Sequence, residues 1–377
     1  MKAERTYLDW NATAPLRPEA RAAMVAALDL VGNPSSPHAE GRRARAVVED
    51  ARESVARLVG ARPSEVVLTS GGTEANNAVF AGNWTTVLVA DIEHDSVLAP
   101  ARASGARIVA LPVSDTGVVR ADRAADLIQG AREAGPALLS LQLANNETGV
   151  LQPVAEIAGL AREQGLLVHS DAVQAVGRVA VDMAALGADF LTLSAHKIGG
   201  PKGVGALVIR DGAHIPAFVR GGGQERRRRA GTEAVAAIAG FGAAVEAARR
   251  DLAGMARVAA LRARLEAEVI RLAPDAVIVA AEAERLPNTS CVAVPGTAAE
   301  TLVIALDLAG IAVSAGAACS SGKVGASHVL EAMGVAPHVA RAAIRVSLGW
   351  SSTEADVAAF LEAWTHVAVR RRERAVA

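Results

Sequence analysis

Lysine is scarce in this chain, and one lysine lies where a strand runs into glycines. Only Lys2, Lys197, Lys202 and Lys323 are lysines among 39 basic residues, so arginine occupies nearly every position that needs only a positive charge. A lysine amine can lose its proton and condense with a carbonyl, whereas a guanidinium cannot. The stretch FLTLSAHKIGGPKG therefore marks Lys197 as a candidate Schiff-base lysine. The alternative is an exposed lysine that ends a strand.

Two segments have the residues to bind a phosphate. The segment VVLTSGGTEANNAVF predicts a strand, a glycine turn and a helix with Thr73 at its N-cap, and the free N–H groups of a first helical turn attract anions. Before Lys197, Ser194 and His196 alternate along the predicted strand, so we expect them to share one face as further donors. Because threonine caps after glycine are common in α/β proteins, a cap without a ligand is the alternative for Thr73.

Two further residues suit a flat heterocyclic ring. Asp171, in HSDAVQ, follows a predicted strand, and His94, in EHDSV, follows another. A carboxylate can keep a ring nitrogen protonated, which pyridoxal phosphate needs in order to act as an electron sink. The alternatives are an N-cap role for Asp171 and a surface or capping role for His94. Taken with a lysine and a phosphate cup, these residues predict pyridoxal phosphate as the cofactor.

These residues follow short apolar runs that alternate with amphipathic helical stretches. Strands are predicted at 66–69, 87–90, 107–111, 138–141, 167–170, 190–194 and 206–209, and helices at 42–58, 73–83, 95–104, 120–130 and 154–164. This β-α-β alternation predicts an α/β fold with a mostly parallel seven-stranded sheet. Active residues are then expected at the carboxyl ends of its strands.

The last third of the chain has a different pattern. Residues from Thr232 to about Leu272 are helical and rich in alanine. After them come predicted strands at 290–294, 311–314 and 343–348, a helix at 300–309 and a final helix from Thr353. We predict a large cofactor-binding domain over residues 15–255 and a smaller α+β domain made of residues 1–14 and 256–377.

Composition excludes several classes of protein. With 39 basic and 40 acidic residues the net charge is -1, which gives no positive field to hold a nucleic acid or an anionic membrane. The first residues lack an apolar signal core, and the longest apolar stretch, 234–245, is too short to span a membrane. We expect a cytoplasmic protein with small-molecule partners and no direct binding to nucleic acid.

Cys291 and Cys319 are the only cysteines. Two distant thiols cannot form a disulfide scaffold, a zinc cage or a four-ligand iron–sulfur site, so we expect no permanent metal. Cys319 lies in SAGAACSSGKVGAS, whose small residues are typical of a mobile loop. A thiolate there could attack substrate sulfur and carry it away. Cys291, in the apolar SCVAV, is predicted to be an inert buried thiol.

An ordered series of motifs extends over nearly the whole chain, and through it the sequence resembles the cysteine desulfurases. The matching stretches are YLDWNATAPLRP, GNPSSPHAEGR, LTSGGTEANN, EHDSV, NNETGVLQP, HSDAVQAVG, LSAHKIGGPKG, GGGQERRRRAGT, LPNTS, SAGAACSSGKVGASHVLEAMGV and IRVSLG. The resemblance implies a homodimeric, pyridoxal-phosphate-dependent enzyme of fold type I that converts L-cysteine to L-alanine and an enzyme persulfide. The spacing from Cys319 to His328 resembles the long-loop group, which works with an iron–sulfur scaffold protein.

The resemblance also implies a role for each matching residue. Lys197 corresponds to the Schiff-base lysine, Asp171 to the partner of the ring nitrogen, His94 to the residue stacked on the ring, and Gln174 to the residue bonded to its phenolic oxygen. The implied phosphate ligands are Thr73, Ser194, His196 and, from the neighbouring subunit, Thr232. Asn146 and Arg345 would hold the substrate carboxylate, and an arginine fork suits a carboxylate. Cys319 would carry the persulfide and could transiently ligate a nascent cluster.

Two other functions stay open at this point. A selenocysteine lyase or another class-V aminotransferase would share Lys197 and Asp171 but would not need Cys319 to abstract sulfur. A non-catalytic platform in a cluster-assembly complex would tolerate loss of Lys197, and the presence of that lysine counts against it. The run Arg226–Arg229 either lines the dimer or cofactor mouth or is a solvated charge run.

Overall fold

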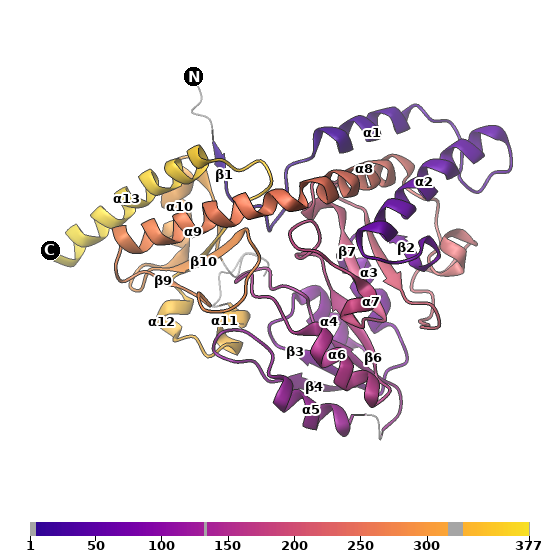
Figure 1. The fold of residues 1–377 in the computed structure, drawn as a ribbon, viewed down its shortest axis with the longest axis horizontal. Coiled ribbons are helices and arrows are strands. Elements are labelled where there is room, and N and C mark those ends of the chain that lie inside the picture. Colours follow the sequence, from indigo (N-terminus) through magenta and orange to yellow (C-terminus); the bar gives the residue numbers. More distant parts are fainter. Residues whose placement is uncertain (1–4, 132–133, 316–326, 377) are drawn as a thin grey trace.

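A seven-stranded sheet forms the centre of the larger part of the molecule (Figure 1). The computed structural model describes residues 5–131, 134–315 and 327–376. The strand order is β2 (Val66–Thr69), β8 (Gly205–Ile209), β7 (Phe190–Ser194), β6 (Leu167–Asp171), β5 (Ala137–Ser140), β3 (Thr86–Ala90) and β4 (Arg107–Leu111). Strand β8 runs antiparallel to both of its neighbours, and the other pairs are parallel. The predicted α/β fold with a mostly parallel seven-stranded sheet is confirmed.

Helices cover both faces of this sheet, and alternate strand residues face the two helical layers. Val87 and Val89 pack with helices α3 (Gly72–Phe80) and α4 (Asp95–Ala103). Leu88 and Ala90 belong to the core on the other face, which includes α2 (Ala39–Leu58), α6 (Val154–Glu163) and α8 (Val235–Asp251). Burial on both faces explains why these strands are almost wholly apolar.

The remaining helices of this part are shorter or lie near its edge. They are α1 (Pro18–Leu28), α5 (Ala121–Gln129) and α7 (Met183–Leu186), with the 3₁₀ turns η1 (Pro63–Glu65), η3 (Ala195–Lys197) and η4 (Gln224–Arg227). The amphipathic pattern of α2 is clear, because Ala44, Val48, Ala51 and Val55 recur every three or four residues and are all buried. Each predicted helix in this region is present, with ends shifted by up to three residues.

A long helical rod leads to the second part of the molecule. Helix α8 continues through η5 (Leu252–Gly254) into α9 (Met255–Leu272). Figure 1 shows these helices end to end, with α8 in the larger part and α9 in the second. The second sheet has the order β12 (Ser314–Ala315), β13 (Ala343–Ser347), β10 (Thr289–Ala293) and β9 (Val277–Ile278) and is antiparallel. Helices α10 (Ala299–Leu308), α11 (His328–Ala332), α12 (Pro337–Ala340) and α13 (Glu354–Val376) accompany it.

The N-terminal segment belongs to this second part. Strand β1 (Thr6–Tyr7) pairs in parallel with β11 (Ile311–Ala312), and Leu8 lies in the core formed by α9, α10 and α13. Strand β1 is not among the strands predicted from the sequence. The strand predicted at 311–314 is wrong as a single element, because β11 pairs with β1 whereas β12 joins the four-stranded sheet.

The arginine run at 226–229 is not a uniformly solvated charge run, because Arg228 and Arg229 are partly buried. Glu225, Arg226 and Arg227 have φ values of 46°, 56° and 65°. Glu225 is buried and paired with Arg52 of α2 at 2.7 Å, while Arg229 pairs with Glu74 of α3 at 2.9 Å. The turn is therefore fixed from both ends to helices of the large sheet.

Candidate active site

The carboxyl ends of six strands lie at one edge of the large sheet, because of its seven strands β8 alone runs in the opposite direction. Asp171 is the last residue of β6, and Lys197 lies three residues after β7. His94 follows β3 and Asn146 follows β5. The structure thus places these four predicted site residues after strand ends of one sheet, as expected.

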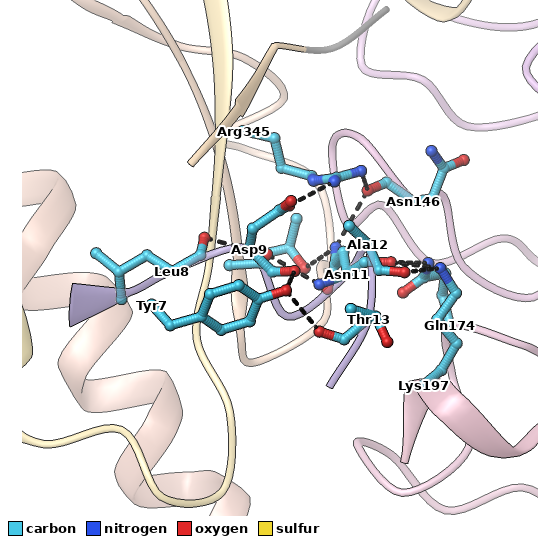
Figure 2. A network of polar contacts seen from close by, with 12 residues as sticks. Tyr7, Leu8, Asp9, Asn11, Ala12, Thr13, Asn146, Gln174, Lys197 and Arg345 are labelled. Carbon is cyan, nitrogen blue, oxygen red and sulfur yellow. Dashed lines mark hydrogen bonds and ion pairs between the residues drawn. The ribbon is translucent and has the colours of Figure 1, made fainter. Parts of the chain in front are cut away.

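Lys197 reaches the N-terminal segment of the chain. Its Nζ donates to the backbone oxygen of Asn11 at 2.6 Å and to that of Ala12 at 2.9 Å (Figure 2). Asn11 is almost completely buried, and its side-chain amide contacts Asn146, Asn288 and Thr289. A segment of the second part of the fold therefore sets where the lysine amine lies.

Asp171 presents a carboxylate held by two donors. Its Oδ1 accepts from the backbone N–H of Val173 at 2.9 Å, and its Oδ2 accepts from Nδ2 of Asn76 at 2.9 Å. The first contact is the local turn that the alternative interpretation expects. Both oxygens keep further lone pairs, so the carboxylate can still accept from a protonated ring nitrogen.

Gln174 has its amide orientation fixed by a buried arginine. Arg178 donates from Nη1 to Oε1 of Gln174, and Nε2 of Gln174 donates to the Asn11 backbone oxygen at 3.1 Å. One N–H of the Gln174 amide then remains for another acceptor. Burial, with a smaller effect of Arg345, lowers the pKa of Arg178 to about 9.

The expected phosphate cup differs from the prediction in its cap. The N-cap of α3 is Gly71, with φ 154°, and Thr73 lies inside the first turn, so the assignment of Thr73 to the N-cap is wrong. Glycine is suited to this backbone conformation. A methyl group placed on Gly71 would meet no atom within 4 Å, whereas one on Gly72 would lie 3.7 Å from Cβ of Ser194. The helix terminus is thus open beside Gly71, and Ser194 borders it.

His196 does not share a strand face with Ser194. Strand β7 ends at Ser194, and Ala195–Lys197 turns as 3₁₀ helix, so the two-residue alternation stops there. Nδ1 of His196 lies 3.2 Å from Oγ1 of Thr13. Burial, followed by the charges of Lys197 and Lys202, lowers the pKa of His196 to about 4. A neutral imidazole with one nitrogen near Thr13 results.

Arg345, on β13, has a buried guanidinium that contacts Asp9 of the N-terminal segment. Its Nη2 donates to Oδ1 of Asp9 at 2.8 Å and its Nη1 to the Asn146 backbone oxygen at 3.1 Å. Its Nε is buried and makes no hydrogen bond to a described residue. The Asn146 side-chain amide points away from Arg345 (Figure 2), so the structure brings the two predicted carboxylate ligands together through the Asn146 backbone and not through its amide.

His94 begins helix α4 and lies close to the other charged groups. Its Nδ1 accepts from the Ser96 backbone N–H at 3.0 Å, which is the capping role named as the alternative. Burial lowers the pKa of His94, and the charge of Lys197 adds to this while that of Asp171 opposes it. The neighbouring Glu93 is completely buried, and burial raises its pKa well above the ordinary value.

Three predicted roles remain, those of Cys319, Thr232 and Cys291. Cys319 lies outside the described residues. Thr232 is exposed in the segment between η4 and α8. Cys291 is buried on β10, and burial raises its pKa to about 12, as expected for an inert thiol.

The side chains and backbone groups at this edge fit pyridoxal phosphate. An open helix N-terminus with a serine suits a phosphate, the Asp171 carboxylate suits a pyridine nitrogen, and the remaining Gln174 N–H suits a phenolic oxygen. The Lys197 amine, at the same edge of the sheet, suits the aldehyde. In the part of the chain that the structure describes, no group of three metal-ligating side chains occurs.

Comparison with known proteins decides the family. The profile described as Aminotransferase class-V matches residues 6–360. The chain belongs to the class-V aminotransferase family. Among class-V relatives, a cysteine desulfurase of Cereibacter sphaeroides is 43% identical over 371 residues, which cover 95% of this chain and 94% of the relative. A cysteine desulfurase IscS of Dictyoglomus turgidum is 40% identical over 95% of this chain and 92% of its own.

Solved class-V structures share the fold. A NifS-like protein from Rickettsia africae superposes with a TM-score of 0.89 at 35% identity, covering 97% of this chain and 99% of that one. A structure described as SspA in complex with cysteine superposes with a TM-score of 0.78 at 28% identity, over 91% of this chain and 98% of that one. The resemblance to cysteine desulfurases, and with it fold type I, is confirmed. Class-V membership also carries dependence on pyridoxal phosphate.

Sequence reasoning missed four residues that hold this site together. Asp9, Asn11, Asn76 and Arg178 contact Arg345, Lys197, Asp171 and Gln174 respectively. Asp9 and Asn11 lie in YLDWNATAPLRP and Asn76 lies in LTSGGTEANN. Those motifs supplied the family resemblance, so the signal was present, but an asparagine amide shows no chemistry until its neighbours are known.

Proposed function

We propose that this protein is a cysteine desulfurase that converts L-cysteine to L-alanine and carries the sulfur on Cys319 as a persulfide. One observation carries the proposal: residues 9–12 contact both the Lys197 amine, through Asn11 and Ala12, and the Arg345 guanidinium, through Asp9. The Asp171 carboxylate lies at the end of β6, at the same edge of the sheet as Lys197. The full-length similarity to cysteine desulfurases supports cysteine as the substrate.

Arg345 is the group that would take the substrate carboxylate. The described contacts use one donor on Nη1 and one on Nη2 and leave Nε without a partner among the described residues. A guanidinium has five N–H groups, so an incoming carboxylate can still be held by two of them. Asp9 fixes the plane of the fork before the substrate arrives.

Lys197 would hold the cofactor and then move a proton. Bound pyridoxal phosphate supplies an electron sink for the substrate Cα, with Thr73, Ser194 and His196 at its phosphate, His94 on its ring and Gln174 at its phenolic oxygen. The freed Lys197 amine takes the proton from Cα of the substrate. The Asn11 and Ala12 oxygens, both within 3 Å of Nζ, then hold the resulting ammonium.

Sulfur transfer requires a thiolate, which we assign to Cys319. The Cys319 Sγ attacks the substrate sulfur and forms an S–S bond, while the Cβ–S bond of the substrate breaks and leaves its electron pair on carbon. Protonation of that carbon and return of a proton from the Lys197 ammonium to Cα give L-alanine. Cys291 is unsuited to this step, because it is buried and burial raises its pKa to about 12.

We further propose a homodimer in which Thr232 of one subunit reaches the phosphate site of the other. Thr232 is exposed. Helix α1 and the loop after it also expose large apolar side chains, with Leu28 71% and Val31 82% accessible. Exposed apolar residues that cluster in this way are typical of protein interfaces.

Several coarser proposals accompany this one. We place the domain division at residues 15–255 against residues 1–14 and 256–377, supported by the pairing of β1 with β11. We propose a cytoplasmic location and delivery of sulfur to an iron–sulfur scaffold or another acceptor protein, with at most a transient cluster ligand at Cys319. No helix within the described residues is long and apolar enough to cross a membrane.

The test is turnover of L-cysteine with a thiol reductant, with sulfide and alanine measured together. We expect equal amounts of both products from the unmodified protein and neither from Lys197→Ala or Cys319→Ala. Cys291→Ala is the matched thiol control and should retain activity. Full activity of Cys319→Ala on cysteine, or transfer of the amino group without release of sulfide, would favour a lyase or an aminotransferase instead.

A further inference from the structure

A buried asparagine joins two parts of the candidate site that lie on different strands. Asn76, on α3, is completely buried. Its Nδ2 donates to Oδ2 of Asp171 at 2.9 Å and to Oγ of Ser96 at 2.9 Å. Ser96 Oγ in turn lies 2.8 Å from Nδ1 of His94. A continuous chain of hydrogen bonds thus runs from Asp171 through Asn76 and Ser96 to His94.

Chemistry fixes the direction of each bond in this chain. A carboxylate can only accept, so the amide nitrogen of Asn76 and not its oxygen must face Asp171. The Ser96 oxygen accepts from that same nitrogen, which leaves the Ser96 hydroxyl hydrogen free to donate to His94. The backbone N–H of Ser96 also points at Nδ1 of His94, at 3.0 Å. Nδ1 therefore receives two donors and has no room for its own proton.

We propose that Asn76 is a positioning residue that fixes His94 as the tautomer with its proton on Nε2 while holding the carboxylate of Asp171. With Nδ1 occupied, Nε2 is the ring nitrogen left to face a ligand, and it donates. His94 then presents a hydrogen-bond donor, not an acceptor, toward the bound cofactor or substrate. This inference deepens the proposed function, since it concerns residues of the same site.

The charges around His94 agree with a neutral ring. Burial has the largest effect and lowers its pKa. Lys197 and His328 lower it further, while Asp171 and Asp95 raise it. The two groups that raise the pKa lie on β6 and α4, and the two that lower it lie on η3 and α11.

The proposal can be tested in the protein without cofactor, by ¹⁵N NMR of its histidine rings. A His94→Gln variant assigns the His94 signals among the eight histidines. We expect an unprotonated Nδ1 and a protonated Nε2 at about pH 7.5, above the ordinary pKa of histidine. A protonated Nδ1 in the unmodified protein would overturn the proposal, whether or not the enzyme turns over cysteine.

Variants separate positioning from simple packing. In Asn76→Ala the Ser96 hydroxyl is released and can turn its hydrogen away, so that a proton on Nδ1 is opposed only by the Ser96 backbone N–H. The His94 pKa should then rise, and its protonation constant should increase by up to ~10-fold. In a Ser96→Ala background the same substitution should raise the His94 pKa clearly less, because only the contact with Asp171 is then lost. Asn77→Ala is the matched control, because Asn77 is on the same helix and donates only to the Thr73 backbone oxygen. Equal shifts with and without Ser96 would contradict a role through that hydroxyl.

The Asp171 end of the chain has its own measurement. Asn76→Ala should weaken equilibrium binding of pyridoxal phosphate, because Asp171 loses a donor, whereas Ser96→Ala should leave it nearly unchanged. If both variants bind pyridoxal phosphate as the unmodified protein does, Asn76 does not position Asp171. This measurement needs no turnover, so it remains decisive if the chain proves to act on another amino acid.

Discussion

The two thiols of the chain differ because of where each lies. Cys291 on β10 is 1% exposed, and burial raises its pKa to about 12. A thiol reacts through its thiolate, and near neutral pH a group with such a pKa has almost none. Cys319 lies outside the described residues, and its sequence surroundings contain no apolar residue larger than alanine within three positions on either side.

We therefore predict that iodoacetamide will leave Cys291 unmodified in the native protein at neutral pH. Labelling should reach Cys291 only after unfolding in urea, as measured by mass spectrometry of the peptide that contains it. The Cys319→Ala variant serves as the simplest sample, because it retains only the buried thiol. Rapid labelling of that variant under native conditions would show that β10 opens far more readily than its burial suggests.

At this scale the sequence predicts residues with distinctive chemistry and misses those that position them. Lys197, Asp171 and Arg345 could be named because amines, carboxylates and guanidinium groups point to particular reactions. Asn76 and Asn11 could not be, since their value lies in contacts with residues such as Asp171 or Thr289, which are 95 and 278 positions away. The N-cap of α3 was misplaced because a glycine and a threonine both suit that position.

Single buried side chains also join whole elements. His169 on β6 lies between Ser140 of β5, at 2.8 Å, and Thr192 of β7, at 3.0 Å. It is completely buried, and burial lowers its pKa to about 3. The native state therefore holds His169 neutral in a pH range where the unfolded chain would protonate it.

The predicted consequence is a pH-dependent stability. Because the native pKa lies below the unfolded one, the contribution is complete above about pH 6.5 and is lost as pH falls toward 3, at ~1.4 kcal/mol per pH unit. Urea unfolding of the unmodified protein at a series of pH values should show this loss, and the slope should be smaller by that amount in His169→Gln. Parallel slopes for the two proteins would mean that His169 becomes protonated without unfolding.

The pair Arg52 and Glu225 fixes the η4 turn to helix α2. Both side chains are buried and make two bonds at 2.7 and 2.8 Å, and Glu225 also accepts from the Leu68 backbone N–H. Arg52→Ala would leave a buried carboxylate unpaired, so we expect the free energy of unfolding to fall by about 3–5 kcal/mol. Arg57→Ala, on the same helix with a half-exposed partner Glu246, should cost less than about 1 kcal/mol. Similar costs for the two variants in urea titrations would refute this ranking.

Elements were predictable wherever the apolar pattern is local. All seven strands of the large sheet lie within one residue of their predicted positions, because buried strands are short, apolar and bounded by turns. Strand β1 was missed since two residues carry no periodicity, and its partner β11 is about three hundred positions away. The break at Ala195–Lys197 was missed because a 3₁₀ turn leaves no pattern in sequence.

For the whole molecule, the proposed dimer makes a testable claim about α1. Leu28→Glu together with Val31→Glu should shift the sedimentation coefficient from that of a dimer to that of a monomer, because two charges would be buried in the interface. Leu308→Glu is the matched control, because Leu308 on α10 is 83% exposed. This variant should leave the sedimentation coefficient at that of the dimer. If the double variant remains dimeric, the interface lies elsewhere.

A shared site predicts complementation between defective subunits. Lys197→Ala and Thr232→Ala homodimers should each be inactive or weak. A mixed dimer, refolded from both, combines an intact Lys197 from one subunit with an intact Thr232 from the other in one of its two sites. Recovery of up to half the activity per mixed dimer is expected, and no recovery would place Thr232 outside the partner's site.

The contacts of residues 9–12 have a consequence for how the protein is made. The Arg345 that pairs with Asp9 is synthesised 336 positions after it. Lys197 and its carbonyl partners on Asn11 and Ala12 are separated by nearly half the chain. During synthesis the large sheet can form while this N-terminal segment still has no strand to join. The site is therefore completed only after β13 has been synthesised, and a truncated chain that lacks β13 should retain the lysine without the geometry to use it.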